Sequence, residues 1–199
     1  MIHATPVYIR YEPELMHDQL PYQIALTLLP HTGPVWARTL LDTFGNAEAI
    51  FKSSFRELKK MEGISDARMY AIKHFNQMHL AEKEASYIVK NKITTLFLTD
   101  ANYPKRLLQC PDAPILLYQL GDVNLNKPKV LSIIGTRKNT EYGKRIVAQL
   151  IDALAQQDIL IVSGLAFGID ALAHQGALKH QLATVGVLAH VFNSMYPAE

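Results

Sequence analysis

Cysteine is almost absent from this 199-residue sequence, in which Cys110 stands alone. A single cysteine cannot close a disulfide within the chain, so a disulfide scaffold and zinc sites built on cysteine pairs are excluded. Long hydrophobic runs are missing too, because the most apolar stretch, residues 158–173, contains Gly164, Gly168 and Asp170. The amino terminus has no signal-peptide pattern. We therefore expect a cytoplasmic protein with no part in a membrane.

A strong charge of either sign is also lacking. The chain has 20 Lys and Arg against 18 Asp and Glu, a net charge of +2, while its 49% hydrophobic content is that of a globular protein. Positive charge nevertheless concentrates within residues 127–145, which hold six basic side chains and one acidic one. A local basic patch attracts phosphate, although a basic run is also typical of a solvated surface. The six residues are Lys127, Lys129, Arg137, Lys138, Lys144 and Arg145.

The amino-terminal part, residues 1–92, is predicted to be an all-helical domain. Apolar residues recur there at helical spacing, and a turn at residues 30–34 separates two helical patterns. The same layout returns in residues 58–75 around Gly63, which predicts a tandem helix-hairpin-helix (SAM-like) arrangement. Such turns hold phosphate through backbone N–H groups. A bundle used for packing or for protein contacts is the alternative, because each turn has one glycine.

The pattern changes in residues 93–199, which are predicted to form a Rossmann-like domain. Short apolar strands at residues 130–134, 159–162 and 183–188 alternate with helices at residues 141–156 and 169–180. This alternation is typical of a parallel sheet buried on both faces. The fold class is therefore α/β, a helical domain followed by a parallel-sheet domain.

Two glycine-containing loops follow the first two strands of that sheet, at residues 135–140 and 163–168. Ligands of parallel sheets bind where strands lead into helices, and glycine lets backbone N–H groups approach an anion. Arg137, in the first loop, is suited to gripping a phosphate. The dinucleotide fingerprint and the P-loop pattern are both absent, so ordinary NAD and ATP sites are disfavoured and no cofactor is predicted.

Asp170 and His174 are four residues apart on one helix face. This spacing suits a metal site or an acid–base pair. A structural role is favoured instead, because a carboxylate in the first turn of a helix is stabilised by the helix dipole and would repel a bound phosphate. No metal site is predicted.

Several motifs together resemble the DNA-processing protein A family (DprA/Smf). Residues 133–137 are similar to its strand and G-S/T-R loop. Residues 163–170, with Ala173, His174 and residues 176–178, are similar to its second motif, S-G-L-A-x-G-I-D-x-x-A-H-x-G-A-L. A lead-in segment and a third strand match as well, at Tyr103, Pro104, Pro114, Leu117, Tyr118, Gly121, residues 184–188, Tyr196 and Pro197.

This resemblance implies a non-enzymatic protein that binds single-stranded DNA without strong sequence preference and passes it to the RecA recombinase in natural transformation. It also implies a homodimer in the full-length protein. The implied phosphate pocket comprises Gly135, Thr136, Arg137, Ser163, Gly164 and Gly168, extended by Lys138, Lys144 and Arg145.

The chain departs from the family pattern at two places. Phe167 stands where the family often has arginine, and an aromatic ring there suits stacking on a base. Residues 191–193 replace the usual Gly-Leu-Asp. The family sequences continue past the Tyr-Pro turn at residues 196–197, so we expect a Rossmann-like domain that is incomplete at its carboxyl end.

Two other functions stay open from the sequence. The fold family includes lysine-decarboxylase-like hydrolases of nucleotides, which carry a P-G-G-x-G-T-x-x-E motif that residues 1–199 lack. The helical domain is alternatively a protein-interaction module beside a sheet that serves as scaffold.

Overall fold

The computed structural model describes residues 13–189 and separates the chain into two compact units, which are described one at a time. The first unit ends at Gly121 and the second begins at Asp122. The departure from the family pattern at residues 191–193 and the Tyr-Pro turn at residues 196–197 lie outside the described residues.

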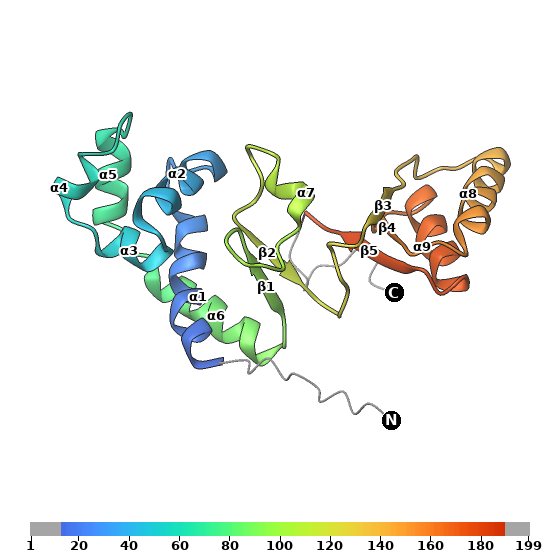
Figure 1. Ribbon diagram of the computed structural model, residues 1–199, viewed down its shortest axis with the longest axis horizontal. Coiled ribbons are helices and arrows are strands. Elements are labelled where there is room, and N and C mark those ends of the chain that lie inside the picture. Colours follow the sequence, from blue (N-terminus) through green and yellow to red (C-terminus); the bar gives the residue numbers. More distant parts are fainter. Residues whose placement is uncertain (1–12, 190–199) are drawn as a thin grey trace, which may run out of the picture. The chain divides into compact units, whose positions relative to one another are not determined.

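The first unit consists of helices followed by two short strands (Figure 1). Its elements are α1 (Pro13–Leu28), α2 (Pro34–Phe44), α3 (Ala47–Lys52), α4 (Phe55–Leu58), α5 (Asp66–Lys73), α6 (Met78–Lys90), β1 (Thr94–Phe97), α7 (Lys105–Leu108) and β2 (Leu116–Gln119).

Side chains next to the helix ends explain where the helices of the first unit begin. Asn46 accepts a hydrogen bond from the third residue of α3, and Ser65 does the same for α5. Ser54 and Glu57 form a reciprocal capping box at α4. These caps satisfy backbone N–H groups that have no partner within the helix. Gly45 ends α2 with φ of +86°, a conformation that favours glycine.

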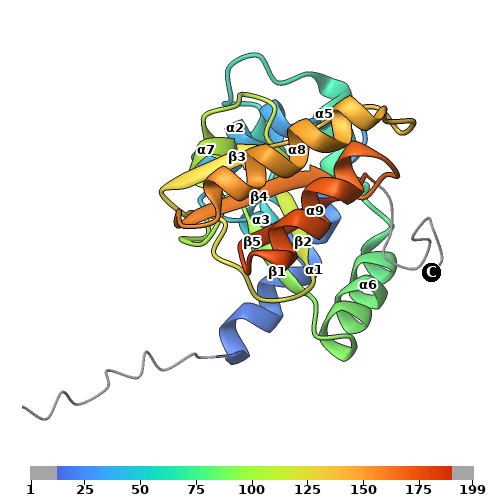
Figure 2. The ribbon, with the colours of Figure 1, turned by 90° about the vertical axis from the view of Figure 1, so that its right-hand side faces the viewer.

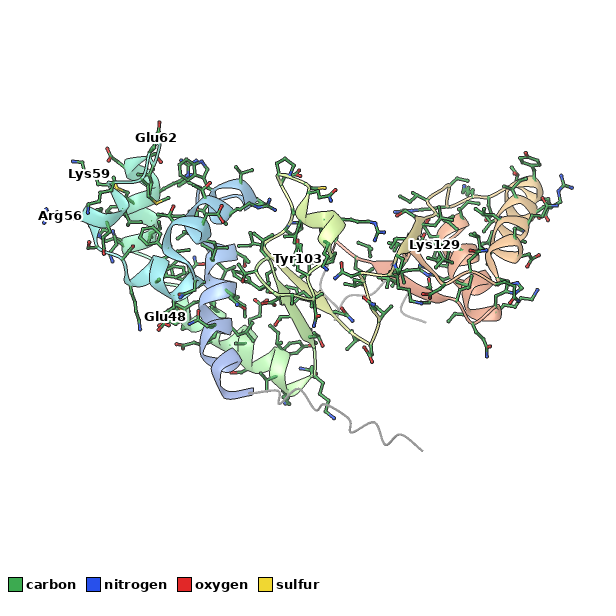
Figure 3. The ribbon with its side chains drawn as sticks, in the orientation of Figure 1. Glu48, Arg56, Lys59, Glu62, Tyr103 and Lys129 are labelled. Atoms are coloured by element: carbon green, nitrogen blue, oxygen red, sulfur yellow. The ribbon has the colours of Figure 1, made fainter. Side chains whose placement is uncertain are left out.

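Strands β1 and β2 belong to the first unit. They pair antiparallel, with Thr94 opposite Gln119, and α1 lies against β2. Tyr103, labelled in Figure 3, lies in the segment that connects the two strands, where it is fully buried and donates a hydrogen bond to the carbonyl of Pro114. The sequence suggested a division at residues 92/93. The compact units divide later, because strand pairing and packing on α1 join this segment to the helices.

The second unit is a parallel α/β sheet, as its strand and helix pattern predicts. Its elements are β3 (Lys129–Ser132), α8 (Glu141–Leu154), β4 (Ile159–Gly164), α9 (Ile169–Lys179) and β5 (Ala183–Val187). The strand order is β3-β4-β5 with both pairs parallel, so the helices are crossover connections. Crossovers of one hand between consecutive neighbours bring both helices to one face of the sheet.

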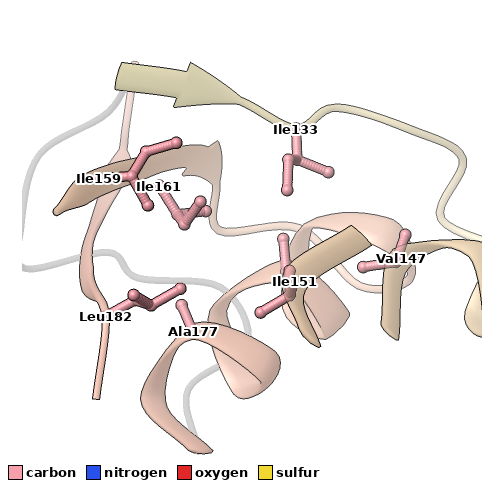
Figure 4. Packing of buried hydrophobic residues seen from close by; sticks show 8 residues of the cluster. Ile133, Val147, Ile151, Ile159, Ile161, Ala177 and Leu182 are labelled. Carbon is pink, nitrogen blue, oxygen red and sulfur yellow. The ribbon is translucent and has the colours of Figure 1, made fainter. Parts of the chain in front are cut away.

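The core of the second unit lies between the sheet and these two helices. Figure 4 shows Ile159 and Ile161 of β4 and Ile133 after β3 on one side, with Val147 and Ile151 of α8 on the other. Helices α8 and α9 run side by side (Figure 2). They pack closely because Gly176 lies against Ile151, where a Cβ atom would be 2.8 Å from that side chain.

The α/β fold class is confirmed, with helices preceding a Rossmann-like parallel sheet. The tandem helix-hairpin-helix arrangement stays a prediction, and the helix that begins its second unit is four residues long, at α4. Within residues 13–189, none of the helices is both long and apolar enough for a membrane span.

Candidate nucleic-acid interface at the strand ends

Two loops of the second unit meet at the carboxyl edge of its sheet. We call residues 133–140, between β3 and α8, the first loop, and residues 165–168, between β4 and α9, the second loop. The backbone N–H of Ile169, the first residue of α9, donates to the carbonyl of Thr136 at 3.2 Å. Gly135 lies so close to Ile169 that a Cβ atom there would be 2.5 Å from its side chain. The loops are thus in direct contact, as neighbouring parallel strands predict.

Gly168 is the point of closest approach between the loops. Its φ is +87°, which disfavours any residue with a side chain. A Cβ atom on Gly168 would also lie 2.2 Å from the carbonyl oxygen of Thr136 and 2.6 Å from that of Arg137. Glycine is therefore required at this position both for its backbone conformation and for the contact with the first loop.

His174 fixes the end of β4 where the second loop begins. Its Nε2 lies 2.8 Å from the carbonyl oxygen of Gly164, and its Nδ1 lies 2.7 Å from the hydroxyl of Thr184 on β5. A carbonyl only accepts, so Nε2 carries the proton and Nδ1 accepts from Thr184. Both ring nitrogens are occupied, which agrees with a structural role and leaves neither for a metal.

Asp170 is buried beside the same loop, in the first turn of α9. Its Oδ2 lies 2.6 Å from where a Cβ atom on Gly164 would be, so a side chain there would displace the carboxylate. Among the described residues Oδ1 has no hydrogen-bond partner. Asp170 therefore shapes the start of the second loop from inside and leaves one acceptor unused.

Ser163 lies at the carboxyl end of β4, with its side chain inside the unit. It is 3% exposed, and its hydroxyl donates to the carbonyl of Ile133 at 2.6 Å. That hydrogen bond joins β4 to the first loop. The hydroxyl is thus engaged within the protein. The role that the family resemblance implies for Ser163 in the phosphate pocket uses its backbone N–H group and stays a prediction.

The first loop carries the exposed polar groups of this edge. The Thr136 hydroxyl accepts from the backbone N–H of Lys138 at 3.2 Å, which holds the loop in a turn. Arg137 and Lys138 are exposed at this turn. Thr140 then caps α8 by accepting from the N–H of Gly143.

A shallow pocket of about 400 Å³ brings the two loops together with the end of β5. Arg137 from the first loop and Phe167 from the second loop, half exposed, both line it. The sequence identified these two residues. It missed the other lining residues, which are Leu165, Ala166, Val187, Leu188 and Ala189. The strand pattern could have indicated Val187, Leu188 and Ala189, because a third parallel strand ends at the same edge of the sheet.

The basic segment of residues 127–145 does not form one patch. Lys127 pairs with Asp158 at 2.5 Å, and Lys129 (labelled in Figure 3) bonds the side chain of Gln157 at 2.6 Å. Both lysines precede or begin β3, while Gln157 and Asp158 precede β4. They therefore lie at the amino edge of the parallel strands, opposite the loops. The segment is divided between the two edges because β3 separates its two ends, so Lys127 and Lys129 lie away from the predicted site residues of the loop and α8.

The remaining basic residues lie on the first turns of α8. Lys144 forms an exposed ion pair with Glu141 at 2.7 Å. The Arg145 guanidinium lies over the ring of Tyr142, 5.6 Å from its centre. Arg137 and Lys138 are thus the basic side chains of the first loop itself, and of the two Arg137 lines the pocket.

These features define a Rossmann-like α/β protein whose carboxyl edge combines an exposed arginine, an exposed aromatic ring and tightly packed glycine loops. Among residues 13–189 there is no cluster of three His, Cys, Asp or Glu side chains suited to a metal ion. Arg137 and Phe167 supply a cationic group and an aromatic ring at this edge.

Comparison with known proteins gives the family. The model of the DNA recombination-mediator protein A family matches residues 94–199, more than half of the chain, so the chain belongs to this family. The matched segment begins at β1 and includes all of the described second unit.

Two curated relatives carry the names DprA and Smf. A DNA processing protein DprA from Bacillus subtilis is 38% identical over 108 residues, 54% of this chain and 36% of its own length. A protein Smf from Synechocystis is 29% identical over 93% of this chain and 48% of its own length. The chain thus spans about half or less of these relatives' lengths.

A solved structure extends the likeness to the fold. The X-ray structure of DprA from Streptococcus pneumoniae superposes with a TM-score of 0.66 at 24% identity, over 89% of this chain and 60% of that chain. At this identity the match concerns the fold alone.

Proposed function

We propose that this protein binds single-stranded DNA at the carboxyl edge of the second unit, and that it acts by binding rather than by catalysis. The observation that carries the proposal is that Arg137 and Phe167 come from two different loops and line one pocket. An arginine offers a bidentate grip on a phosphate. An exposed aromatic ring offers a stacking surface to any base.

The geometry suits contacts that do not depend on sequence. Arg137 and Lys138 are exposed on the first loop, where they meet phosphates, which carry no sequence information. Phe167 stacks on bases of every kind. Gly135 and Gly168 let the two loops pack against each other, which keeps the elements that carry Arg137 and Phe167 close together.

The names of the relatives support a place in DNA processing and recombination. Delivery of the bound strand to the RecA recombinase in natural transformation, a homodimer of the full-length protein and a cytoplasmic location complete the proposal. The resemblance of the motifs to the DprA/Smf family supports these parts.

The decisive experiment is fluorescence anisotropy of a labelled oligothymidine titrated with the protein at several salt concentrations. Arg137→Ala should weaken binding about tenfold and flatten the slope of log affinity against log salt by about 0.7, the value for one phosphate contact on a single strand. Arg137→Lys should recover part of the affinity because it retains charge but not the bidentate geometry.

Lys129→Ala is the matched control. It removes one positive charge from the same segment but at the opposite edge of the sheet, so it should leave affinity within about twofold of the parent. Equal losses for Arg137→Ala and Lys129→Ala would show a nonspecific charge effect and reject the pocket. Release of free base from a nucleoside monophosphate would reject the non-catalytic part and favour a hydrolase.

A further inference from the structure

The first unit contains a larger groove that the proposed function does not use. It has a volume of about 760 Å³ and lies among α4, α5, the segment after α5 and the turn between α1 and α2. The lining residues that carry the argument are His31, Phe55, Ala67, Tyr70, Ala71 and His74. Its volume falls within the range of pockets that hold small organic ligands.

Exposed aromatic rings form one wall of this groove. Tyr70 and His74, one turn apart on and just after α5, are stacked with ring centres 3.8 Å apart and planes at 17°. Phe55 of α4 meets His74 edge-on at 6.4 Å. Tyr70 is 61% exposed and Phe55 is 48% exposed. Large aromatic side chains normally bury most of their surface, so this grouping is an open stacking platform.

Hydrogen bonds and ring contacts within the protein fix the position of the residues on both walls of the groove. His74 Nδ1 donates to the carbonyl of Tyr70 at 3.0 Å, which fixes the plane of the histidine ring. On the other wall, His31 has φ of +59°, a conformation uncommon for residues with a side chain. Arg68 donates to the His31 carbonyl at 2.9 Å and lies 4.1 Å from the Trp36 ring centre. Both walls are therefore preorganised by contacts within the protein.

The charge near the groove favours an anionic occupant. Residues 52–75 contain six basic and three acidic side chains, and one of the basic residues, Lys52, is paired with Glu48 just before this range. Arg56 and Lys59 are exposed on and just after α4, and Figure 3 shows both pointing away from the body of the helices. One of the three acidic residues, Glu57, is engaged in the capping box with Ser54. The other two, Glu62 and Asp66, are exposed, and Asp66 lines the groove.

We propose that this groove is a second contact site for single-stranded nucleic acid, in which bases stack on Tyr70 and Phe55 while Arg56 and Lys59 meet phosphates. Exposed aromatic rings interleaved with basic side chains are the pattern by which proteins hold single strands without sequence preference. Ala67 and Ala71 also line the groove, and their small side chains leave room beside the rings. The inference goes beyond the proposed function, since it concerns the helical unit and does not depend on the loops of the sheet.

The test uses the full chain and a labelled oligothymidine. The double variant Phe55→Ala with Tyr70→Ala should bind the strand about tenfold more weakly than the parent. Tyr70→Phe should retain parental affinity, because it keeps the ring. Tyr87→Ala is the matched control, since Tyr87 is 40% exposed on α6 and does not line the groove. Circular dichroism of each variant checks that the helical content is unchanged.

An abasic strand of the same length separates this site from the loop site. Loss of the groove rings should not change affinity for the abasic strand, because it has no bases to stack. Arg137→Ala should still weaken that binding if the loop site holds phosphates. Parental affinity of a folded Phe55/Tyr70 double variant for oligothymidine would overturn the inference and leave the groove to a protein partner. An effect of the double variant without an effect of Arg137→Ala would uphold the inference and reject the proposed function.

Discussion

The two loops at the carboxyl edge of the sheet differ in how much of their surface is committed to the protein. In and around the second loop, Gly168 touches the first loop, and the carbonyl of Gly164 is held by His174. The first loop instead presents Arg137 and Lys138 outward. Apart from the exposed ring of Phe167, the second loop is thus committed to contacts within the protein, whereas the first loop supplies the positive charge. Substitutions in the two loops should therefore affect different measurements.

Gly168→Ala should have the largest effect, and it should act on stability. The new Cβ atom would meet the Thr136 carbonyl at 2.2 Å at a φ of +87°, so we expect a loss of about 3 kcal/mol in the free energy of unfolding of the second unit. Urea unfolding followed by circular dichroism measures this loss. Trp36 is the sole tryptophan and lies in the first unit, so its fluorescence transition should move little.

Gly33→Ala provides the control for that variant. Gly33 has φ of −75°, and no atom lies within 4 Å of the position that a Cβ atom would take there. The substitution should therefore cost less than about 1 kcal/mol. Equal losses for the two glycines would show that close contact between the loops contributes nothing to stability.

His174→Ala should have the second-largest effect on stability. It removes the hydrogen bonds to the Gly164 carbonyl and the Thr184 hydroxyl, so we expect a loss of about 2 kcal/mol in unfolding free energy. The same urea experiment measures it, with the exposed His79→Ala as control. Destabilisation no greater than that of His79→Ala would mean that the histidine does not hold the second loop in place.

Thr140→Ala tests whether every residue of the first loop acts on strand binding. Thr140 belongs to that loop, but its side chain caps α8. Loss of its hydrogen bond from Gly143 should cost about 1 kcal/mol of stability, while Thr140→Ser should restore it. Strand affinity, measured by anisotropy, should remain close to that of the parent. A large drop in affinity with unchanged stability would move Thr140 from the helix cap to the binding edge.

Lys138→Ala should have the smallest effect and should leave stability unchanged. Removing one exposed cation from the first loop should weaken strand binding about threefold at moderate salt. Lys144→Ala should do less, because Lys144 is already paired with Glu141. A ranking with Lys144 above Lys138 would place the path of the strand along α8 rather than across the loop.

Much of the structure at the carboxyl edge of the sheet could be predicted from the sequence. The alternation of apolar strands and amphipathic helices predicted the parallel sheet, and parallel strands place their following loops at one edge. The pattern therefore placed the loops that carry Arg137 and Phe167 at the same edge, where both residues line one pocket. Ser163 was less readable, because nothing in a strand sequence tells which hydroxyl turns inward to a neighbouring carbonyl.

The sequence by itself determined the order of the elements, because hydrophobic period, caps and glycine turns are local properties of the chain. Only the tertiary structure divided the basic segment between two edges, joined β1 and β2 to the helical unit and grouped Phe55, Tyr70 and His74 around one groove. These outcomes depend on which distant residues become neighbours. That choice is made by packing and strand pairing, which the spacing of residues along the chain does not encode.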